Sequence, residues 1–182
     1  MKSFEYRHVV SFEDTNFVGN VYFSKYLSWQ GRCRELFLQQ YAPGMLDELN
    51  NGLAMVTLRC SCEYLDQLHP FDKVAVLMMM KHVQQNRIAM EFEYWRVAPG
   101  ERMLVARGDH ETACMRRDGE TLRPCAIPPP LRDALKSVLG RVPGRGSAAY
   151  RPVLAPSTGA EEVRFPQDRS DAMVSTYGGH HE

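Results

Sequence analysis

Two polar side chains, Gln30 and Arg34, stand in the middle of an otherwise apolar helical pattern. At about 100° per residue they fall on the same side of the helix as Tyr26, which precedes them by one and two turns. A buried guanidinium needs a partner, because an unpaired charge inside a protein is heavily penalised. One interpretation is a structural arginine bonded to a carboxylate or to carbonyl groups of a sheet. The other is that Tyr26, Gln30 and Arg34 line one edge of a ligand cavity.

The helix that carries these residues is predicted to begin near Val21 or Tyr22, with Asn20 as its N-cap. One broad face is apolar and holds Tyr22, Phe23, Tyr26, Leu27, Trp29, Cys33, Phe37 and Leu38. The opposite, solvated face holds Lys25, Ser28, Arg32, Glu35 and Gln39. This amphipathic pattern predicts a helix packed against a sheet.

A strand and a polar loop precede the helix. Over residues 3–12 apolar side chains alternate with polar ones, which is typical of a half-buried strand. The predicted inward set is Phe4, Tyr6, His8, Val10 and Phe12. Residues 13–20 then form the loop that leads into the helix.

The rest of the folded region is predicted to be a meander of strands. After a connection at residues 47–52, strand-like runs follow at 53–65, 73–82, 88–97 and 103–116, and a turn leads into a short run at 122–126. A short helix is expected at 131–139, after three prolines. One strand, one long helix and then a strand meander is an α+β arrangement. A second copy of the chain can close the exposed sheet edge.

Composition excludes several classes of protein. The formal net charge is zero, which argues against a general nucleic-acid binder and against a polybasic membrane anchor. No stretch of 18 consecutive apolar residues occurs, and the N-terminal residues lack the apolar core of a signal peptide. We expect a cytoplasmic protein without a nucleic-acid or membrane partner.

The cysteines and histidines form no metal-binding pattern. The five cysteines are unevenly spaced, and their odd number favours reduced thiols. None of the six histidines has a metal-ligand spacing. We therefore predict no metal site and no cofactor.

The composition changes at Gly140. From there to Glu182 the chain is rich in Gly, Pro, Ser, Ala and Arg and lacks apolar periodicity. We predict a folded domain over residues 1–139 and a disordered tail over 140–182. The alternative for the tail is a docking peptide for a carrier protein or a partner enzyme.

Three sequence strings point to a known family. DTNFVGNVYFSKYLSWQGRCRE at residues 14–35, CSCEY at 60–64 and LVARG at 104–108 resemble the hotdog-fold thioesterases of the 4-hydroxybenzoyl-CoA type. The similarity is to the branch that serves enediyne polyketide synthases, and it covers roughly residues 3–138. It implies an antiparallel sheet wrapped around one long helix, with dimers that join edge to edge and pair into tetramers.

The resemblance also implies a substrate. It would be a polyunsaturated β-ketoacyl chain, held as a thioester on the acyl carrier domain of an iterative polyketide synthase. Hydrolysis would release a β-keto acid, which decarboxylates to a polyene methyl ketone. Two alternatives remain open, a general acyl-CoA thioesterase and a non-catalytic acyl-binding subunit of a synthase.

The same resemblance assigns the catalytic residues. Alignment by Phe12 and Gly19 places Asn16 where the superfamily usually carries an aspartate that acts as base or nucleophile. Asparagine can do neither, so the resemblance implies an oxyanion site made of Asn16, Arg34 and the backbone N–H near Phe23, with Tyr26 matching a tyrosine of the branch. Water would then be the nucleophile.

Other residues have secondary roles in this prediction. Gln30, Thr57 and Ser61 are candidates for substrate binding, and Thr57 and Ser61 are expected on the strand face opposite Cys60. Asp14 or Glu13 could serve as a base in the loop. For Asp14, capping or an ion pair with Arg34 is the favoured interpretation.

Overall fold

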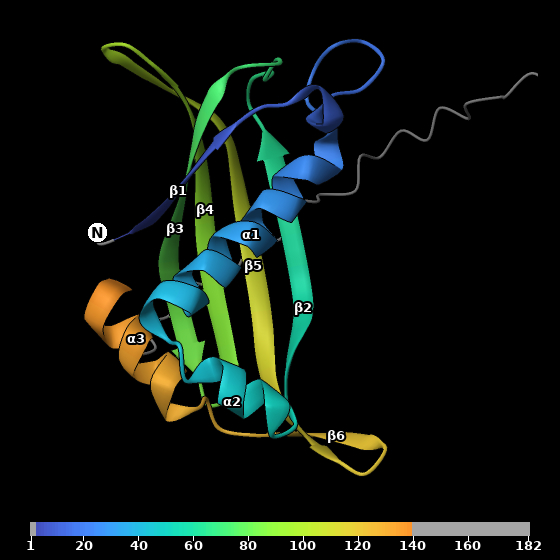
Figure 1. The fold of residues 1–182 in the computed structure, drawn as a ribbon, viewed down its shortest axis with the longest axis vertical. Coiled ribbons are helices and arrows are strands. Elements are labelled where there is room, and N and C mark those ends of the chain that lie inside the picture. The colour runs from blue at the N-terminus through green and yellow to red at the C-terminus, as the bar shows by residue number, and fades with distance from the viewer. Residues whose placement is uncertain (1–2, 140–182) are drawn as a thin grey trace, which may run out of the picture. The chain divides into compact units, whose positions relative to one another are not determined.

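A curved antiparallel sheet and a long helix that crosses its concave face organise the computed structural model of this protein (Figure 1). The structure describes residues 3–139. Its elements in chain order are β1 (Phe4–Val9), the 3-10 helix η1 (Phe12–Asp14), α1 (Phe23–Tyr41), α2 (Met45–Asn50), β2 (Leu53–Tyr64), β3 (Lys73–Gln84), β4 (Arg87–Ala98), β5 (Glu101–Asp118), β6 (Thr121–Pro124) and α3 (Pro129–Leu139).

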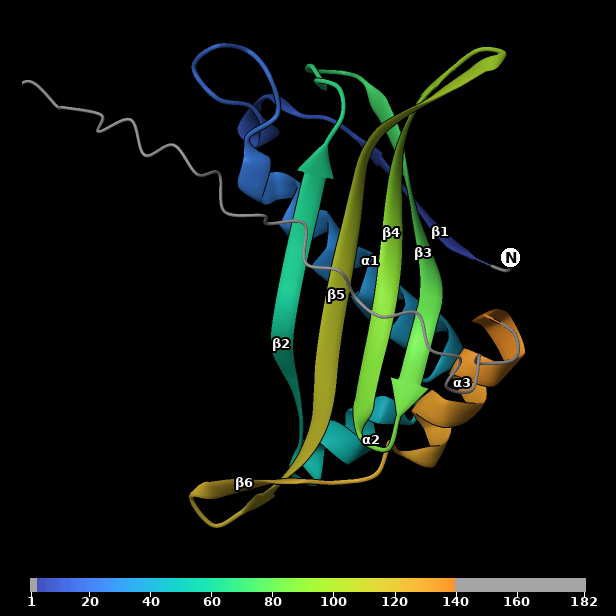
Figure 2. The ribbon, with the colours of Figure 1, turned by 180° about the vertical axis from the view of Figure 1, so that it is seen from behind.

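The strands lie in the order β1-β3-β4-β5-β2, and β6 pairs with β5. Every pairing is antiparallel. The view from behind shows the other face of the sheet, with β2 and β1 at its two edges (Figure 2). This is the α+β arrangement predicted from the sequence.

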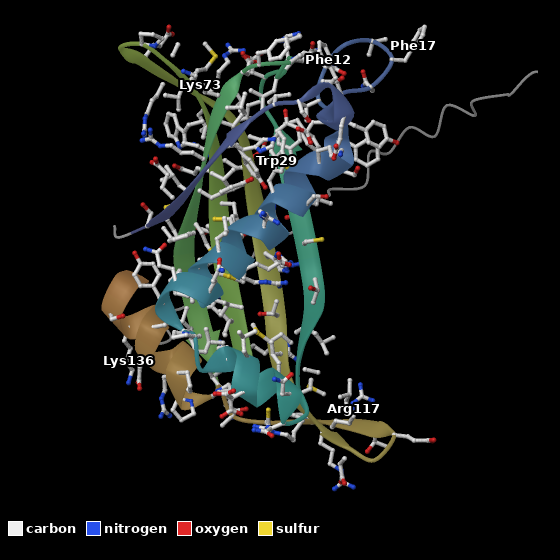
Figure 3. The ribbon with its side chains drawn as sticks, in the orientation of Figure 1. Phe12, Phe17, Trp29, Lys73, Arg117 and Lys136 are labelled. Carbon is white, nitrogen blue, oxygen red and sulfur yellow. The ribbon has the colours of Figure 1, made fainter. Side chains whose placement is uncertain are left out.

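The core lies between α1 and the concave face of the sheet. From α1 it receives Tyr26, Trp29, Cys33 and Phe37, all at most 4% exposed. Figure 3 shows Trp29 between the helix and the strands. Val76, Met78, Phe92 and Tyr94 of β3 and β4 are also fully buried. Each large apolar side chain buried in this way contributes roughly 1.5–3 kcal/mol, so the helix is fixed along its length.

The structure corrects two expectations about the secondary structure. Residues 47–50 of the predicted connection belong to the helix α2 (Met45–Asn50), which buries Met45. The first strand ends at Val9, so Phe12 does not belong to its inward set and is 69% exposed. Phe12 instead packs edge-on against the ring of Phe71. The alternating pattern continues past the strand because the 3-10 turn starts with an aromatic residue.

None of the helices within residues 3–139 is long and apolar enough to cross a membrane. The predicted tail, residues 140–182, and its docking alternative lie outside the described residues.

Candidate active site

The loop between η1 and α1 closes on itself around Asn16. The Asn16 amide donates to the carbonyl of Asn20 at 2.9 Å, and the Gly19 amide donates to the carbonyl of Asn16 at 3.0 Å. Gly19 has φ +84°, a conformation that favours glycine. The Asn16 side chain accepts from the Val18 amide at 3.0 Å through Oδ1. Its Nδ2 group is left to donate to a ligand. Phe17, at the tip of this loop, points away from the protein (Figure 3).

The N-terminus of α1 lacks a side-chain cap. Tyr22 occupies the N-cap position without a capping hydrogen bond, and the first turn contains no acidic residue. The predicted cap, Asn20, is therefore wrong, because the loop ends two residues before the helix and uses the Asn20 backbone to close itself. The Lys25 amide donates to the Tyr22 carbonyl, and the amide groups of Phe23 and Ser24 keep their capacity to bind an anion or a polarised carbonyl.

A cavity of about 240 Å³ opens at this helix end. Asn16, Phe23 and Tyr26 all line it, so three of the four predicted catalytic residues share one cavity. Asn20 and Asp66 also line it, and Oδ1 of Asn20 is buried without a hydrogen-bond partner. The cavity thus combines an uncapped helix terminus with two amide side chains.

Tyr26 brings a phenol to the lining of this cavity. The residue is 3% exposed, and its ring packs against those of Trp29, Tyr64 and Tyr94. Burial raises the pKa of Tyr26 well above its usual value, and nearby acidic groups, among them Cys62 and Asp66, add to this. The phenol therefore stays protonated and cannot act as a base at neutral pH.

Asp66, which sequence analysis missed, supplies a carboxylate to this cavity. It follows β2, and its Oδ2 accepts from Nη2 of Arg96 at 3.1 Å while Oδ1 accepts from the Gln67 amide at 2.9 Å. No sequence motif marks it. Only the fold shows that the loop after β2 meets the N-terminus of α1.

Arg34 is not among the residues that line this cavity. It follows Tyr26 by eight residues, about 12 Å along the helix axis. Its Nη1 lies 3.2 Å from Nε2 of His110 on β5, and its Nε is buried without a partner. Within residues 3–139 no carboxylate is at ion-pair distance from Arg34. One chain therefore does not bring Asn16 and Arg34 into the same cavity.

His110 is the second residue that sequence analysis missed. It is 6% exposed, and its Nε2 also lies 3.3 Å from Oγ1 of Thr57. Burial and then the charge of Arg34 lower the pKa of His110 from 6.5 to about 4. The imidazole is therefore neutral at pH 7. One signal in the sequence could have identified His110: it is a histidine on the inward face of a strand that is rich in buried residues.

Gln30 and Ser61 are joined by a structural hydrogen bond. Gln30 is fully buried, as predicted, and its Nε2 donates to the carbonyl oxygen of Ser61 at 2.9 Å. Gly108 makes this contact possible, since a Cβ there would overlap both Gln30 Nε2 and that carbonyl. Oε1 of Gln30 remains buried without a partner.

A bulge in β2 changes the expected faces. The register shifts between Thr57 and Arg59, so that Thr57 pairs with Thr112 and Cys60 pairs with His110. Thr57 and Cys60 therefore share the helix-facing side. Ser61 pairs with Asp109 and lies on the other face, so the expectation that it shares a face with Thr57 is wrong. A strict period of two cannot anticipate a bulge.

Asp14 does not pair with Arg34. Its Oδ2 accepts from the amide and hydroxyl of Ser11 at 3.0 and 2.9 Å and lies 2.9 Å from Nε2 of His8. Nζ of Lys25 is 3.6 Å from its Oδ1. Burial opposes ionisation, but these hydrogen bonds outweigh it and lower the pKa of Asp14. The carboxylate is thus held in a closed structural network.

A larger, mostly apolar cavity of about 670 Å³ lies between the C-terminal half of α1 and α2, and it includes none of the predicted site residues.

In the part of the chain that the structure describes, no group of three or more His, Cys, Asp or Glu side chains is placed to hold a metal ion.

With this geometry established, comparison with known proteins identifies the family. The sequence model of the Thioesterase-like superfamily matches residues 10–135, which is more than half of the chain. This protein belongs to the Thioesterase-like superfamily. Comparison with curated protein sequences gives no significant match.

Solved structures agree with the family assignment. A crystal structure of the dynemicin thioesterase, from work on polyene binding by that protein, is 49% identical, with a TM-score of 0.72 over 75% of this chain and 96% of that one. The 1,4-dihydroxy-2-naphthoyl-CoA thioesterase from Synechocystis has 19% identity and a TM-score of 0.66 over 75% and 97% of the two chains. The 4-hydroxybenzoyl-CoA thioesterase from Pseudomonas sp. strain CBS-3 has 20% identity and a TM-score of 0.62 over 75% of this chain and 99% of that one. The hotdog fold is confirmed, and the chain is a thioester hydrolase.

Proposed function

We propose that this thioesterase hydrolyses a polyunsaturated β-ketoacyl thioester carried on the acyl carrier domain of an iterative enediyne polyketide synthase. The released β-keto acid then loses carbon dioxide to give a polyene methyl ketone. The 49% identity to the dynemicin thioesterase, a protein described as binding polyene, supports this substrate class. The observation that carries the proposed chemistry is the uncapped N-terminus of α1, which opens onto a cavity shared with Asn16.

In this proposal the cavity polarises the thioester carbonyl. Nδ2 of Asn16 and the amide of Phe23 donate to the carbonyl oxygen, and the protonated Tyr26 hydroxyl adds a third donor. Each such donor is typically worth about 3–4 kcal/mol of barrier. Two or three donors therefore support hydrolysis without the aspartate that the superfamily usually carries at the position of Asn16.

Arg34 joins the site in this proposal through a second copy of the chain. β2 is a sheet edge twelve residues long, which suits antiparallel pairing with its counterpart in another copy. A twofold axis across β2 makes the two α1 helices run antiparallel on one face of the joined sheet. The middle of one helix, with Arg34, then faces the N-terminus of the other, where Asn16 lies. Pairing of such dimers would give the expected tetramer.

Asp66 orients the attacking water in this scheme. It is a carboxylate in the lining of the cavity, and its ion pair with Arg96 holds it in place. Hydrolysis needs a proton acceptor for water, and Asn16 cannot provide one. Asp66→Asn should therefore lower turnover while leaving substrate binding in place.

The first test is product release from a polyene-loaded carrier domain, followed by mass spectrometry. Wild-type protein should release free acid or methyl ketone faster than the spontaneous rate, and the CoA thioester of the same chain should react more slowly. Asn16→Ala and Arg34→Ala should each lower turnover by 100-fold or more. Arg32→Ala is the matched control, because Arg32 is an exposed arginine of the same helix, and it should retain full activity.

Other outcomes point to the alternatives. Tight binding without release would favour the acyl-binding subunit, which the missing aspartate makes a physical possibility. Preference for CoA thioesters of unrelated acyl chains would favour a general acyl-CoA thioesterase. Full activity in folded Asn16→Ala and Arg34→Ala proteins would refute the oxyanion site.

A further inference from the structure

Arg34 is a half-buried cation whose hydrogen bond goes to a neutral group. Across residues 3–139, the one hydrogen bond of its side chain is the contact of Nη1 with Nε2 of His110 at 3.2 Å. A guanidinium buried for structural reasons normally pairs with a carboxylate, because desolvation is otherwise uncompensated. The neighbouring acid, Glu35, is exposed and makes no ion pair with it. The charge of Arg34 is therefore held in place without being neutralised.

The geometry also fixes the state of His110. A guanidinium has five donors and no acceptor, so Nε2 of His110 must accept and cannot carry a proton. The single proton of the neutral ring then resides on Nδ1. Oγ1 of Thr57 lies 3.3 Å from the same Nε2, and the ring of Phe92 packs beside the imidazole at 6.3 Å. β2, β4 and α1 together hold the ring against β5.

Several polar atoms in this region have no partner. Beneath α1, they are Gln30 Oε1, Arg34 Nε, His110 Nδ1 and Thr112 Oγ1. Buried polar groups in finished structural networks are almost always hydrogen-bonded. Thr112 is 1% exposed and Gln30 is fully buried, so bulk solvent does not satisfy them. A histidine that served only to fill the core would have no reason to leave both itself and its arginine partly unsatisfied.

We propose that His110 is a positioning residue for Arg34 in the thioesterase reaction. The neutral imidazole orients the guanidinium through Nη1 and leaves its positive charge uncancelled for the developing oxyanion. A carboxylate in place of His110 would orient Arg34 equally well but would cancel its charge. This inference rests on the proposed function, since it assigns His110 a part in the same oxyanion stabilisation.

Three substitutions separate orientation from charge. His110→Gln keeps an acceptor close to the position of Nε2, and it should retain turnover within about threefold. His110→Leu removes the acceptor and should lower kcat by tenfold or more, with KM changed less than threefold. His110→Glu supplies an acceptor that neutralises Arg34, and it should lose as much kcat as His110→Leu. His82→Leu, at a partly buried histidine of β3, is the matched control and should keep full activity.

Turnover of these variants is measured on folded protein with a β-ketoacyl N-acetylcysteamine thioester. If His110 were purely structural, the result would differ. The kcat values of His110→Gln and His110→Glu would then follow the thermal stability of each variant and not the charge at position 110. Equal kcat in wild type and His110→Leu, or full activity in His110→Glu, would overturn the proposal.

A measurement on the full chain without substrate separates this proposal from the proposed function. In protein labelled with ¹⁵N-histidine, the resonances that disappear in His110→Gln should report the Nδ1–H tautomer at pH 7. Arg34→Ala should change that tautomer or its exchange rate. An Nε2–H tautomer or an imidazolium at pH 7 would exclude the contact and with it the proposal. If the tautomer is as expected but wild type releases no product, the proposed function fails, and the role of His110 in hydrolysis fails with it. The contact between Arg34 and His110 would still be supported in that case.

Discussion

Two polar clusters under and beside α1 differ in how completely they are satisfied. At the N-terminal end, Asp14 accepts from the amide and hydroxyl of Ser11, contacts His8 and lies near Lys25. In the middle of the helix, Arg34 contacts a neutral histidine and keeps a buried N–H unpaired. Both clusters hold a charge out of bulk water, but only the first supplies that charge with ionic and hydrogen-bonding partners.

The contrast separates a structural charge from a functional one. A charge whose hydrogen-bonding capacity is filled fixes the chain and has little left to offer a ligand. A charge that is held in a fixed orientation but lacks hydrogen-bonding partners lowers protein stability, and it stabilises the negative charge of a ligand or intermediate bound beside it. Sequence analysis favoured capping or an ion pair with Arg34 for Asp14 over a role as base. The structure confirms the capping, because the Asp14 side chain accepts from the Ser11 amide at the start of η1.

The largest effect on stability is expected for Asp14→Ala. It removes the acceptor of the Ser11 and His8 contacts and should lower the free energy of unfolding by about 3 kcal/mol. Urea denaturation at pH 7 measures this. Glu13→Ala is the control, because the Glu13 side chain is 85% exposed and should change stability by less than about 0.5 kcal/mol. Equal loss in the two variants would mean that the Asp14 network is not structural.

The next effect is a pH dependence carried by His110. Its folded-state pKa is about 4, against 6.5 for the free side chain, so between these values the unfolded chain binds a proton that the folded chain excludes. Stability should therefore fall as pH drops from 6.5 to 4, by on the order of 2 kcal/mol after allowance for partial solvent screening. The contribution of Asp14, whose folded pKa is lowered below 3.8, is lost only at lower pH.

Comparison of wild type with His110→Gln over this window isolates the histidine. The variant should show a shallower loss of stability between pH 6.5 and 4. Parallel curves for the two proteins would place the His110 pKa near its ordinary value and remove the argument that the ring is neutral because it is buried.

A smaller effect of opposite character is expected for Arg34→Met. Since Arg34 has no ionic partner within the described residues, replacement by an apolar side chain of similar length should leave the free energy of unfolding within about 1 kcal/mol of wild type, or raise it. The same variant should lose turnover. A loss of 3 kcal/mol or more would show that Arg34 is structural and that the contrast with Asp14 is mistaken.

The smallest effect tests the bulge in β2. Ser61 lies on the sheet face away from α1, and its side chain makes no hydrogen bond within the described residues. Ser61→Ala should therefore leave kcat within about twofold. Thr57→Val removes the hydroxyl beside His110 and should lower kcat by a few fold. If Ser61→Ala has the larger effect, the register of β2 at the bulge is wrong.

The sequence alone was sufficient for the fold class, the family and the helical positions of the polar residues. Strand alternation, turn residues and the amphipathic pattern of α1 are local signals, and they specified the meander and the burial of Gln30. The resemblance carried by residues 14–35 was likewise written in contiguous residues. Local signals failed at the boundaries of elements, at Asn20 and Phe12, and they missed the short helix α2 at Met45–Asn50.

The tertiary structure decided which side chains meet. His110 and Asp66 lie far along the chain from α1, and the bulge in β2 reverses the face of Ser61. Within one chain, Arg34 also contacts His110 and lies outside the cavity that Asn16 lines. These facts depend on strand register and on contacts between distant segments, and such contacts are fixed by packing of the whole sheet against the helix rather than by any local pattern.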